Sequence, residues 1–343
     1  MAQQIQAPSA IAIEDTGTRL PLVSVLVPAW NEADRIGDCF ESLLAIDWPN
    51  LEILVSAGGS DGTFEAASRF AGDRVLVIRQ RPGQGKQAAL RELFALSRGD
   101  VIYLTDGDCV VPSATFRAVV APIIDREVDA VSGTYRPYRN ALSIPLVFYQ
   151  WSIEWAGRWR MGGETDGLCG ANAAVSRLAL AAAGGFRADV PIGTDVHLSR
   201  LLHLSGFHVS HIEAQVETEY PACLPAFVRR QSRWLRNGLV HGLHFRDRAF
   251  ISTAMRSMAV GTAIVTFPLT WPVTRRWGIL AWAAVFGWLI QRRITYARRL
   301  STDLALAVPP SFLVRLPVFT LIDIASWMLA PLHFASRTRR TRW

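Results

Sequence analysis

Apolar and polar positions alternate in a regular pattern over the first hundred residues of the chain. Short apolar runs typical of buried strands lie at 23–27, 51–55, 75–78 and 101–104. Segments with the apolar spacing of a helix follow the first three runs, at 32–46, 64–71 and 87–97. Four strands that alternate with helices predict an α/β fold built on a doubly wound, mostly parallel sheet.

In such a sheet, ligands bind beyond the carboxyl ends of the strands. Polar loops stand at three of these ends: Asn31 and Glu32 follow the first strand, residues 56–61 follow the second, and residues 106–108 follow the fourth. We therefore expect a ligand site at this edge of the sheet.

The pattern changes after residue 250. The apolar run 251–273 contains one charge, the run 277–290 contains none, and the run 312–334 contains Arg315 and Asp323. Runs of about 20 residues are long enough to cross a bilayer. Tryptophans lie near the ends of the runs, and arginines flank them, as at a membrane–water interface. These features predict membrane helices, and a buried helical subdomain is the alternative.

Three spans would carry the arginines of residues 337–342 to the outer side, against the usual cytoplasmic location of positive charge. We therefore expect two spans and one interfacial helix, formed either by 277–290 or by the proline-interrupted 251–273. Residues 1–20 contain neither a basic segment nor an apolar core of signal-peptide length, which favours a cytoplasmic N-terminus.

Half of the 343 residues are apolar and 19% are charged, which excludes a disordered scaffold. Four cysteines, far apart and without a CxxC pair, argue against a zinc cluster and suit a reducing compartment. The net charge of +7 divides unevenly along the chain. Residues 1–223 hold 18 basic and 26 acidic residues, whereas residues 224–343 hold 18 basic and 3 acidic ones. The arginines of residues 224–343 stand between apolar runs and form no continuous polar stripe. We therefore expect a membrane partner and no nucleic acid.

Two features near the strand ends point to phosphate chemistry. Asp106 and Asp108 directly follow an apolar strand, and two such carboxylates can share a divalent cation that faces a diphosphate; an acidic turn is the alternative. Lys86, the single lysine of the chain, follows a glycine at a helix start, which suits a phosphate. A solvent-facing lysine is the other interpretation.

Two later segments carry further candidates. Asp195 begins a helical pattern and is either a general base or a helix-capping acid. In the segment RQSRW, Trp234 can stack on a sugar and Arg233 can pair with a diphosphate, unless the segment is only a basic surface helix.

In this order the motifs resemble those of an inverting, membrane-anchored glycosyltransferase of family 2 with the GT-A fold. VSVLVPAWNE resembles the first strand of that family, GGSDGT its second-strand turn, and GKQAAL its glycine-lysine helix start. DGD resembles its DxD motif, GTDVHLSRLL the segment of its catalytic base, and RQSRW its QxxRW motif. The resemblance covers about residues 21–240, which we expect to form the catalytic domain between a tail (1–20) and membrane-associated helices with a basic end (241–343).

The resemblance implies roles for particular residues. It implies that Asp195 is the catalytic base and that Asp106 and Asp108 hold Mg²⁺ or Mn²⁺. The implied donor-binding residues are Pro28, Ala29, Asn31, Glu32, Gly58, Asp61, Lys86, Asp106, Gly107, Asp108, Arg230, Arg233 and Trp234. Those implied to contact the sugar or the acceptor are Gly170, Ala171, Asn172, Thr194 and Trp234.

Three positions depart from the family pattern. Ser56 and Ala57 stand where the family usually has an acid pair near the nucleotide base, which leaves the identity of the nucleotide open. Thr194 replaces the glutamate before the base, and Arg230 replaces the glutamine of QxxRW. The RxxRW variant is similar to that of ceramide glucosyltransferases and allied bacterial glycolipid synthases.

The resemblance therefore predicts transfer of a hexose from a nucleotide sugar, such as UDP-glucose, to a lipid hydroxyl in the cytoplasmic leaflet of the inner membrane, with inversion. A polyprenyl-diphosphate-linked oligosaccharide of exopolysaccharide assembly is an alternative acceptor. An inactive nucleotide-sugar-binding membrane protein is an alternative of another class, suggested by Ser56, Ala57 and Arg230. A nucleotidyltransferase leaves RQSRW and the apolar helices unexplained.

Overall fold

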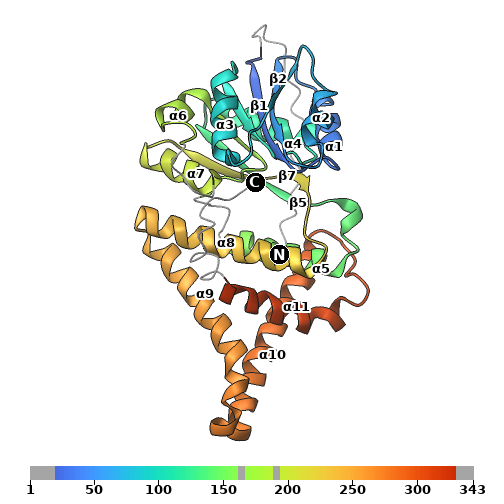
Figure 1. Cartoon of the computed structure of the whole chain (residues 1–343), viewed down its shortest axis with the longest axis vertical. Coiled ribbons are helices and arrows are strands. Elements are labelled where there is room, and N and C mark those ends of the chain that lie inside the picture. Colours follow the sequence, from blue (N-terminus) through green and yellow to red (C-terminus); the bar gives the residue numbers. More distant parts are fainter. Residues whose placement is uncertain (1–19, 161–166, 188–193, 330–343) are drawn as a thin grey trace, which may run out of the picture.

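A seven-stranded mixed sheet forms the upper half of the molecule (Figure 1). The computed structural model describes residues 20–160, 167–187 and 194–329. The strands are β1 (Val23–Trp30), β2 (Leu51–Gly58), β3 (Val75–Arg79), β4 (Val101–Leu104), β5 (Ala130–Pro137), β6 (Ala173–Ser176) and β7 (Val209–Thr218). Their order is β3-β2-β1-β4-β6-β5-β7, and β6 alone among these strands runs antiparallel to its neighbours. The predicted α/β class and mostly parallel sheet are confirmed.

The first two strands are longer than their apolar runs. β1 and β2 pair in register as far as Trp30 and Gly58, so Ser56 and Ala57 lie inside a strand and are fully buried. The predicted polar loop therefore begins only after Gly58. The helix expected at 32–46 is also shorter, because α1 (Ile36–Leu44) begins after a turn in which Asn31 adopts a left-handed φ of 59°.

Alternation along the strands sends side chains to two helical layers. Val25 and Val27 of β1 pack toward α1, α2 (Thr63–Ser68) and α4 (Ser113–Ile124). Leu26 packs toward α3 (Gly85–Leu96), α6 (Arg177–Ala182) and α7 (Thr194–Leu204) on the opposite face. Both faces of the sheet are covered, which leaves its carboxyl edge open to a ligand.

A layer of helices lies below that edge. It contains α5 (Pro145–Arg160), α8 (Leu224–Phe245) and α11 (Phe312–Ser326). A third apolar cluster joins these helices to the C-terminal half of α10 (Trp271–Asp303) through buried side chains that include Phe148, Trp151, Phe227, Leu300 and Phe312. The predicted domain boundary at residue 240 thus falls inside α8.

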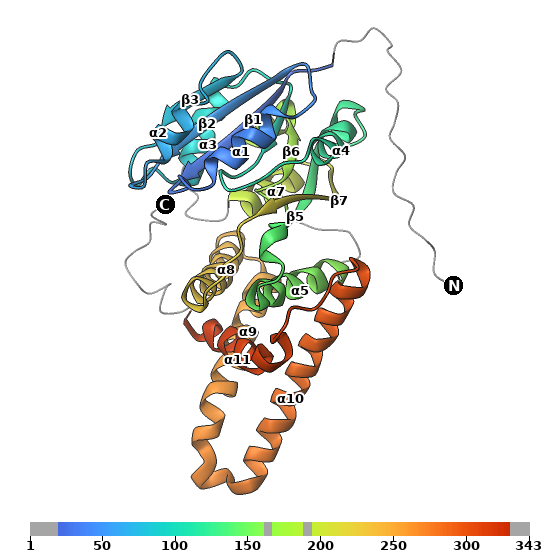
Figure 2. The same ribbon diagram turned by 90° about the vertical axis from the view of Figure 1, so that its right-hand side faces the viewer.

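Two helices extend away from the rest of the chain (Figures 1 and 2). α9 (Arg248–Thr266) continues through the short helix η2 (Phe267–Thr270) into α10. The run expected at 277–290 is part of the 33-residue α10 and does not form a short separate helix. Among the described residues, two stretches are long and apolar enough to cross a bilayer by length and composition, Arg248–Leu269 and Phe312–Leu329.

Candidate functional site

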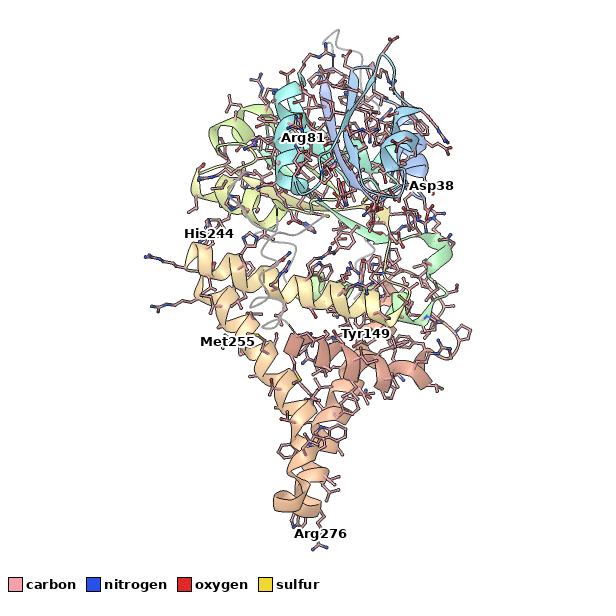
Figure 3. All side chains as sticks on the ribbon, in the orientation of Figure 1. Asp38, Arg81, Tyr149, His244, Met255 and Arg276 are labelled. Carbon is pink, nitrogen blue, oxygen red and sulfur yellow. The ribbon has the colours of Figure 1, made fainter. Side chains whose placement is uncertain are left out.

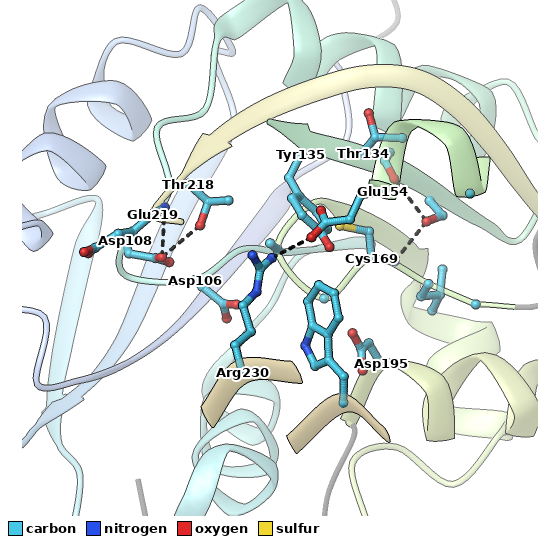
Figure 4. Close-up of a pocket in the computed structure, with 18 of the residues that line it drawn as sticks. Asp106, Asp108, Thr134, Tyr135, Glu154, Cys169, Asp195, Thr218, Glu219 and Arg230 are labelled. Carbon is cyan, nitrogen blue, oxygen red and sulfur yellow. Dashed lines mark hydrogen bonds and ion pairs between the residues drawn. The ribbon is translucent and has the colours of Figure 1, made fainter. Parts of the chain in front are cut away.

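A cavity of about 580 Å³ lies between the carboxyl edge of the sheet and helices α5 and α8 (Figure 4). Half of the predicted site residues line it, although they come from segments spread over 150 positions of the chain. They are Lys86, Asp106, Asp108, Gly170, Ala171, Asp195, Arg230, Arg233 and Trp234. The fold thus brings the expected phosphate, base and stacking groups to one place.

Asp106 stands in the loop that follows β4 and forms an ion pair with Lys86, the second residue of α3. Burial raises the pKa of Asp106, and the lysine opposes that shift. Burial alone would lower the pKa of Lys86, but Asp106 raises it above its ordinary value. The pair places one positive and one negative group at the cavity wall.

Asp108 is held by the ends of β5 and β7. Its Oδ2 accepts hydrogen bonds from Thr218 Oγ1 at 2.8 Å and from the Glu219 amide at 3.4 Å. The hydroxyl of Tyr138 donates to the backbone carbonyl of Asp108. The sequence analysis did not identify Thr218 and Tyr138. Nothing in their local sequence pattern links them to Asp108, which lies 110 and 30 positions earlier in the chain.

Carboxylates are in excess at this edge of the sheet. Partial burial, and then the charges of Asp108 and Asp106, raise the pKa of Glu32 to about 8. Hard oxygen ligands in a field of surplus negative charge fit Mg²⁺ or Mn²⁺. Among the described residues, no group of three or more His, Cys, Asp and Glu is arranged to hold a metal, so the chain offers Asp106 and Asp108 as a pair.

Asp195 lies on another wall of the cavity, near the start of α7. Its Oδ1 accepts a hydrogen bond from the adjacent Val196 amide at 2.9 Å. A Cβ added to Gly170 would lie 3.1 Å from Asp195 Cβ and 3.3 Å from its Oδ2. Because Gly170 has no side chain, the Asp195 carboxylate has the space that it occupies.

Arg230 sits at the centre of a stack that also carries Trp234. The Arg230 guanidinium lies 4.4 Å from the ring centroid of Tyr220 and 4.2 Å from that of Trp234. Its Nη2 is 3.2 Å from Oε1 of Glu154 on α5, and Oε2 of the same carboxylate accepts a hydrogen bond from the Tyr220 hydroxyl. The arginine that departs from the family pattern is therefore matched by Glu154, a cavity residue that no sequence motif marked.

Arg233 differs from Arg230 in its surroundings. It lines the cavity one helical turn from Arg230, and within the described parts of the chain it forms no ion pair with an acid. Burial, followed by repulsion from Arg230 and Arg236, lowers its pKa. A cation under these conditions favours an anionic ligand.

Eight predicted residues lie outside the cavity lining: Pro28, Ala29, Asn31, Glu32, Gly58, Asp61, Gly107 and Asn172. Several of them shape the loops instead. Asn31 Oδ1 accepts from the Ser60 amide at 2.8 Å, and Asp61 Oδ2 accepts from the Ala33 amide at 3.0 Å, so the loops after β1 and β2 are tied together. A Cβ on Gly107 would meet Ala29 Cβ at 2.7 Å.

The side chain of Thr194, the remaining predicted residue, is not among those described.

Asn172 differs from its expected role as a sugar contact. It is fully buried, and its amide nitrogen donates to the carbonyls of Thr134 and Ala214, both at 2.8 Å. Its Oδ1 accepts from the Tyr103 hydroxyl at 2.7 Å. All of these contacts are internal to the sheet region, where Asn172 links β4 and β5.

Comparison with known proteins gives a consistent result. Residues 24–175 match the family model described as glycosyl transferase family 2, and residues 101–336 match that of glycosyl transferase family group 2. The probable glycosyltransferase YdaM of Bacillus subtilis is 29% identical over 248 residues, 67% of this chain and 58% of that protein. The β-monoglucosyldiacylglycerol synthase of Trichormus variabilis is 27% identical over 248 residues, 66% of this chain and 51% of that protein. The chain spans little more than half the length of these two relatives.

One solved structure aligns over most of the chain. The mannosyltransferase PcManGT from Pyrobaculum calidifontis, determined in complex with GDP-Man and Mn²⁺, aligns with a TM-score of 0.57. The alignment covers 91% of this chain and 88% of that one at 21% identity. The likeness shows that the fold is GT-A-like.

The Glu154–Arg230 pair yields a stability prediction. Glu154→Ala leaves Arg230 buried without its acid, which we expect to lower the free energy of unfolding by about 3 kcal/mol. The double variant Glu154→Gln/Arg230→Gln carries no buried charge at this position and should recover most of the loss. Thermal unfolding in detergent measures both variants.

The matched control is Glu65→Gln, which breaks an exposed pair with Arg79 and should change stability by about 0.5 kcal/mol or less. A double variant no more stable than Glu154→Ala would contradict this account of the pair.

Proposed function

Since the chain belongs to glycosyltransferase family 2, we propose that it transfers a hexose from a nucleoside-diphosphate sugar to the hydroxyl of a membrane lipid, with inversion of configuration. The observation that carries the proposal is the composition of one cavity. A carboxylate pair suited to a cation and diphosphate, a separate carboxylate and a stacked tryptophan all line it.

The diphosphate of the donor would lie between Asp106, Asp108 and Arg233. A divalent cation, when bound by the two carboxylates, supplies positive charge that stabilises the leaving nucleoside diphosphate. Arg233 adds a guanidinium with no acidic partner among the described residues, and Lys86 adds an ammonium that is held beside Asp106. The GDP-Man and Mn²⁺ bound by the fold neighbour belong to the same donor and metal classes.

Asp195 would remove the proton from the acceptor hydroxyl, which attacks the anomeric carbon as the bond to the diphosphate breaks. One displacement inverts the configuration, so an α-linked donor gives a β-linked product. No covalent sugar–enzyme intermediate forms, and none of the cavity residues is needed as a nucleophile.

Three features support a lipid acceptor. A β-monoglucosyldiacylglycerol synthase is among the relatives, and Arg230 stands in the RxxRW variant. The cavity is also lined by α5 and α8, which belong to the layer of helices from which α9 and α10 extend. We place the catalytic domain on the cytoplasmic face of the inner membrane.

The direct test is nucleotide release from UDP-glucose by detergent-purified protein with Mn²⁺ or Mg²⁺, with and without diacylglycerol or ceramide. We expect lipid to stimulate release and Asp195→Asn to abolish it while donor binding, measured by calorimetry, is preserved. Asp73→Asn, on the exposed surface far from the cavity, is the matched control.

Undiminished turnover by Asp195→Asn would rule out this base. Release that only polyprenyl-diphosphate-linked acceptors stimulate would favour the exopolysaccharide alternative. If no member of a panel of nucleotide sugars binds, the protein is not a transferase of this kind.

Gly170→Ala tests the packing around the base. The added methyl group would press on the Asp195 carboxylate, and displacing a catalytic group by a fraction of an ångström lowers turnover by about tenfold or more. We expect kcat to fall with little change in Tm. Gly37→Ala in α1, where the new methyl group meets nothing within 4 Å, should leave kcat unchanged and should not lower Tm, because alanine favours a helix.

Chelation tests the cation. EDTA should abolish nucleotide release, and added Mn²⁺ or Mg²⁺ should restore it. Because Asp108 is one of only two carboxylates assigned to the ion, Asp108→Asn should require at least tenfold more metal for half-maximal activity. Full activity in EDTA would contradict the assignment.

A further inference from the structure

We propose that the α9–α10 hairpin, residues 248–291, crosses a lipid bilayer as one unit, while α11 lies within the headgroup layer on the catalytic side. The inference rests on the membrane association in the proposed function and names the segments that carry it. It differs from hydropathy alone, which selects α9 and α11 as the spans.

The two arms of the hairpin approach a bilayer in length. From Arg248 through Thr270 the chain is helical over a length of about 34 Å at 1.5 Å per residue, and the uncharged part of α10 between Arg276 and Arg292 covers about 24 Å. Long arginine side chains at the ends of such a stretch can reach the headgroups. The hydrocarbon core of a bilayer is about 30 Å thick. Trp282 Nε1 donates to the Ile264 carbonyl at 2.8 Å, so the arms are joined to each other.

Large apolar side chains on the hairpin face outward. Leu269 is 78% exposed, Trp277 69%, and both Leu280 and Trp288 57%. An apolar surface of this kind marks a membrane or protein contact. The distribution of charge favours the membrane, because charges gather at the two ends of the hairpin and are nearly absent between them.

At the end nearest the sheet, Arg248 starts α9 and Arg292 follows the apolar part of α10. Arg292 donates to the Tyr296 hydroxyl at 2.7 Å, and its guanidinium lies 4.7 Å from the Trp288 ring centroid. Arginine beside such aromatic rings is typical of a headgroup layer. Arg256, the other charged residue of α9, folds back along the helix and donates to the Ser252 carbonyl at 3.2 Å, toward the same end.

At the opposite end, Arg275 and Arg276 lie just after the turn of the hairpin, and Figure 3 shows Arg276 at the extreme of the molecule. Two arginines are costly in the middle of a bilayer. A hairpin that inserts must therefore carry them through to the far headgroups.

The packing of α11 keeps that helix on the near side. Phe312 and Leu316 of α11 are buried in the cluster shared with α5, while Val314 and Val318 on its other face are 82% and 53% exposed. A helix with one face on protein and one apolar face outward suits an interfacial position.

A buried ion pair fixes the level at which α10 leaves the bilayer. Arg293 Nη2 lies 2.8 Å from Asp323 Oδ2 of α11, and Tyr149 of α5 donates to the same oxygen at 3.0 Å. Beyond this pair, Ala297 and Leu300 of α10 are buried beside α5. The C-terminal third of α10 therefore stays with the catalytic half, which is incompatible with α9 and α11 as the two spans.

The same arrangement orients the protein. The far end of the hairpin holds two arginines, Arg275 and Arg276. The near end holds six close to the hairpin: Arg246, Arg248, Arg292, Arg293, Arg298 and Arg299. Positive charge is retained on the cytoplasmic side. The near side, with the cavity, is accordingly cytoplasmic.

Cysteine accessibility tests this topology. In a Cys169→Ser/Cys223→Ser background, where the remaining Cys39 and Cys109 are buried, single cysteines replace Asp73, Arg276 or Val308. Sealed inverted inner-membrane vesicles are treated with a membrane-impermeant maleimide before and after permeabilisation. Asp73→Cys on the catalytic half and Val308→Cys between α10 and α11 should react at once, and Arg276→Cys only after permeabilisation.

Each other pattern overturns the proposal. Immediate labelling of Arg276→Cys means that the hairpin does not cross, and Trp277→Cys repeats this measurement with both arginines in place. Protection of Val308→Cys together with Arg276→Cys means that α9 and α11 are the spans. A chain that stays out of the vesicle fraction has no span at all.

Nucleotide release is measured separately on the unsubstituted protein, because Cys169 lines the cavity. The expected labelling without transfer to any lipid would refute the proposed function and leave the topology standing. Lipid-dependent transfer with a different labelling pattern would refute only the topology.

Discussion

The constraint on which the site depends is the crowding of carboxylates where the parallel strands end. Burial, and then the charges of Asp108 and Asp106, raise the pKa of Glu32, and among the described residues Lys86 is the one direct ion-pair partner of these two aspartates. Polar groups at the ends of β5 and β7 hold Asp108 by hydrogen bonds without neutralising it. The remaining negative charge is what a divalent cation and, through it, a diphosphate would balance.

Much of this arrangement could be predicted from the sequence, because it depends on local patterns. Apolar runs located the first four strands, and the end of the fourth strand located Asp106 and Asp108. The strand lengths were harder, since Ser56 and Ala57 are polar or small and belong to β2 only through their pairing with β1. Asn172 shows the same limit: its motif marks a loop, but contacts with Tyr103 and Ala214 place it inside the protein.

Glu154 could not have been found in this way. It lies 76 positions before Arg230, on a helix with no recognisable motif, and only the packing of α5 against α8 brings the two side chains together. Once the pair is seen, the departure from QxxRW has a physical reason. Arginine at 230 keeps Trp234 stacked through a guanidinium that an acid from a different helix holds in place, whereas glutamine offers no charge to such an acid.

α8 connects the chemistry to the proposed membrane segment. Arg230, Arg233 and Trp234 lie on this 22-residue helix, which ends at Phe245. Arg246 then adopts a left-handed conformation, and the Asp247 carboxylate accepts hydrogen bonds from the first amides of α9, so the chain turns sharply into the hairpin. Because a helix is stiff over this length, the depth at which the hairpin sits in the bilayer sets the height of the cavity above the lipid surface. In the proposed arrangement, the turn that starts α9 therefore helps to set how far a lipid hydroxyl must rise to reach Asp195.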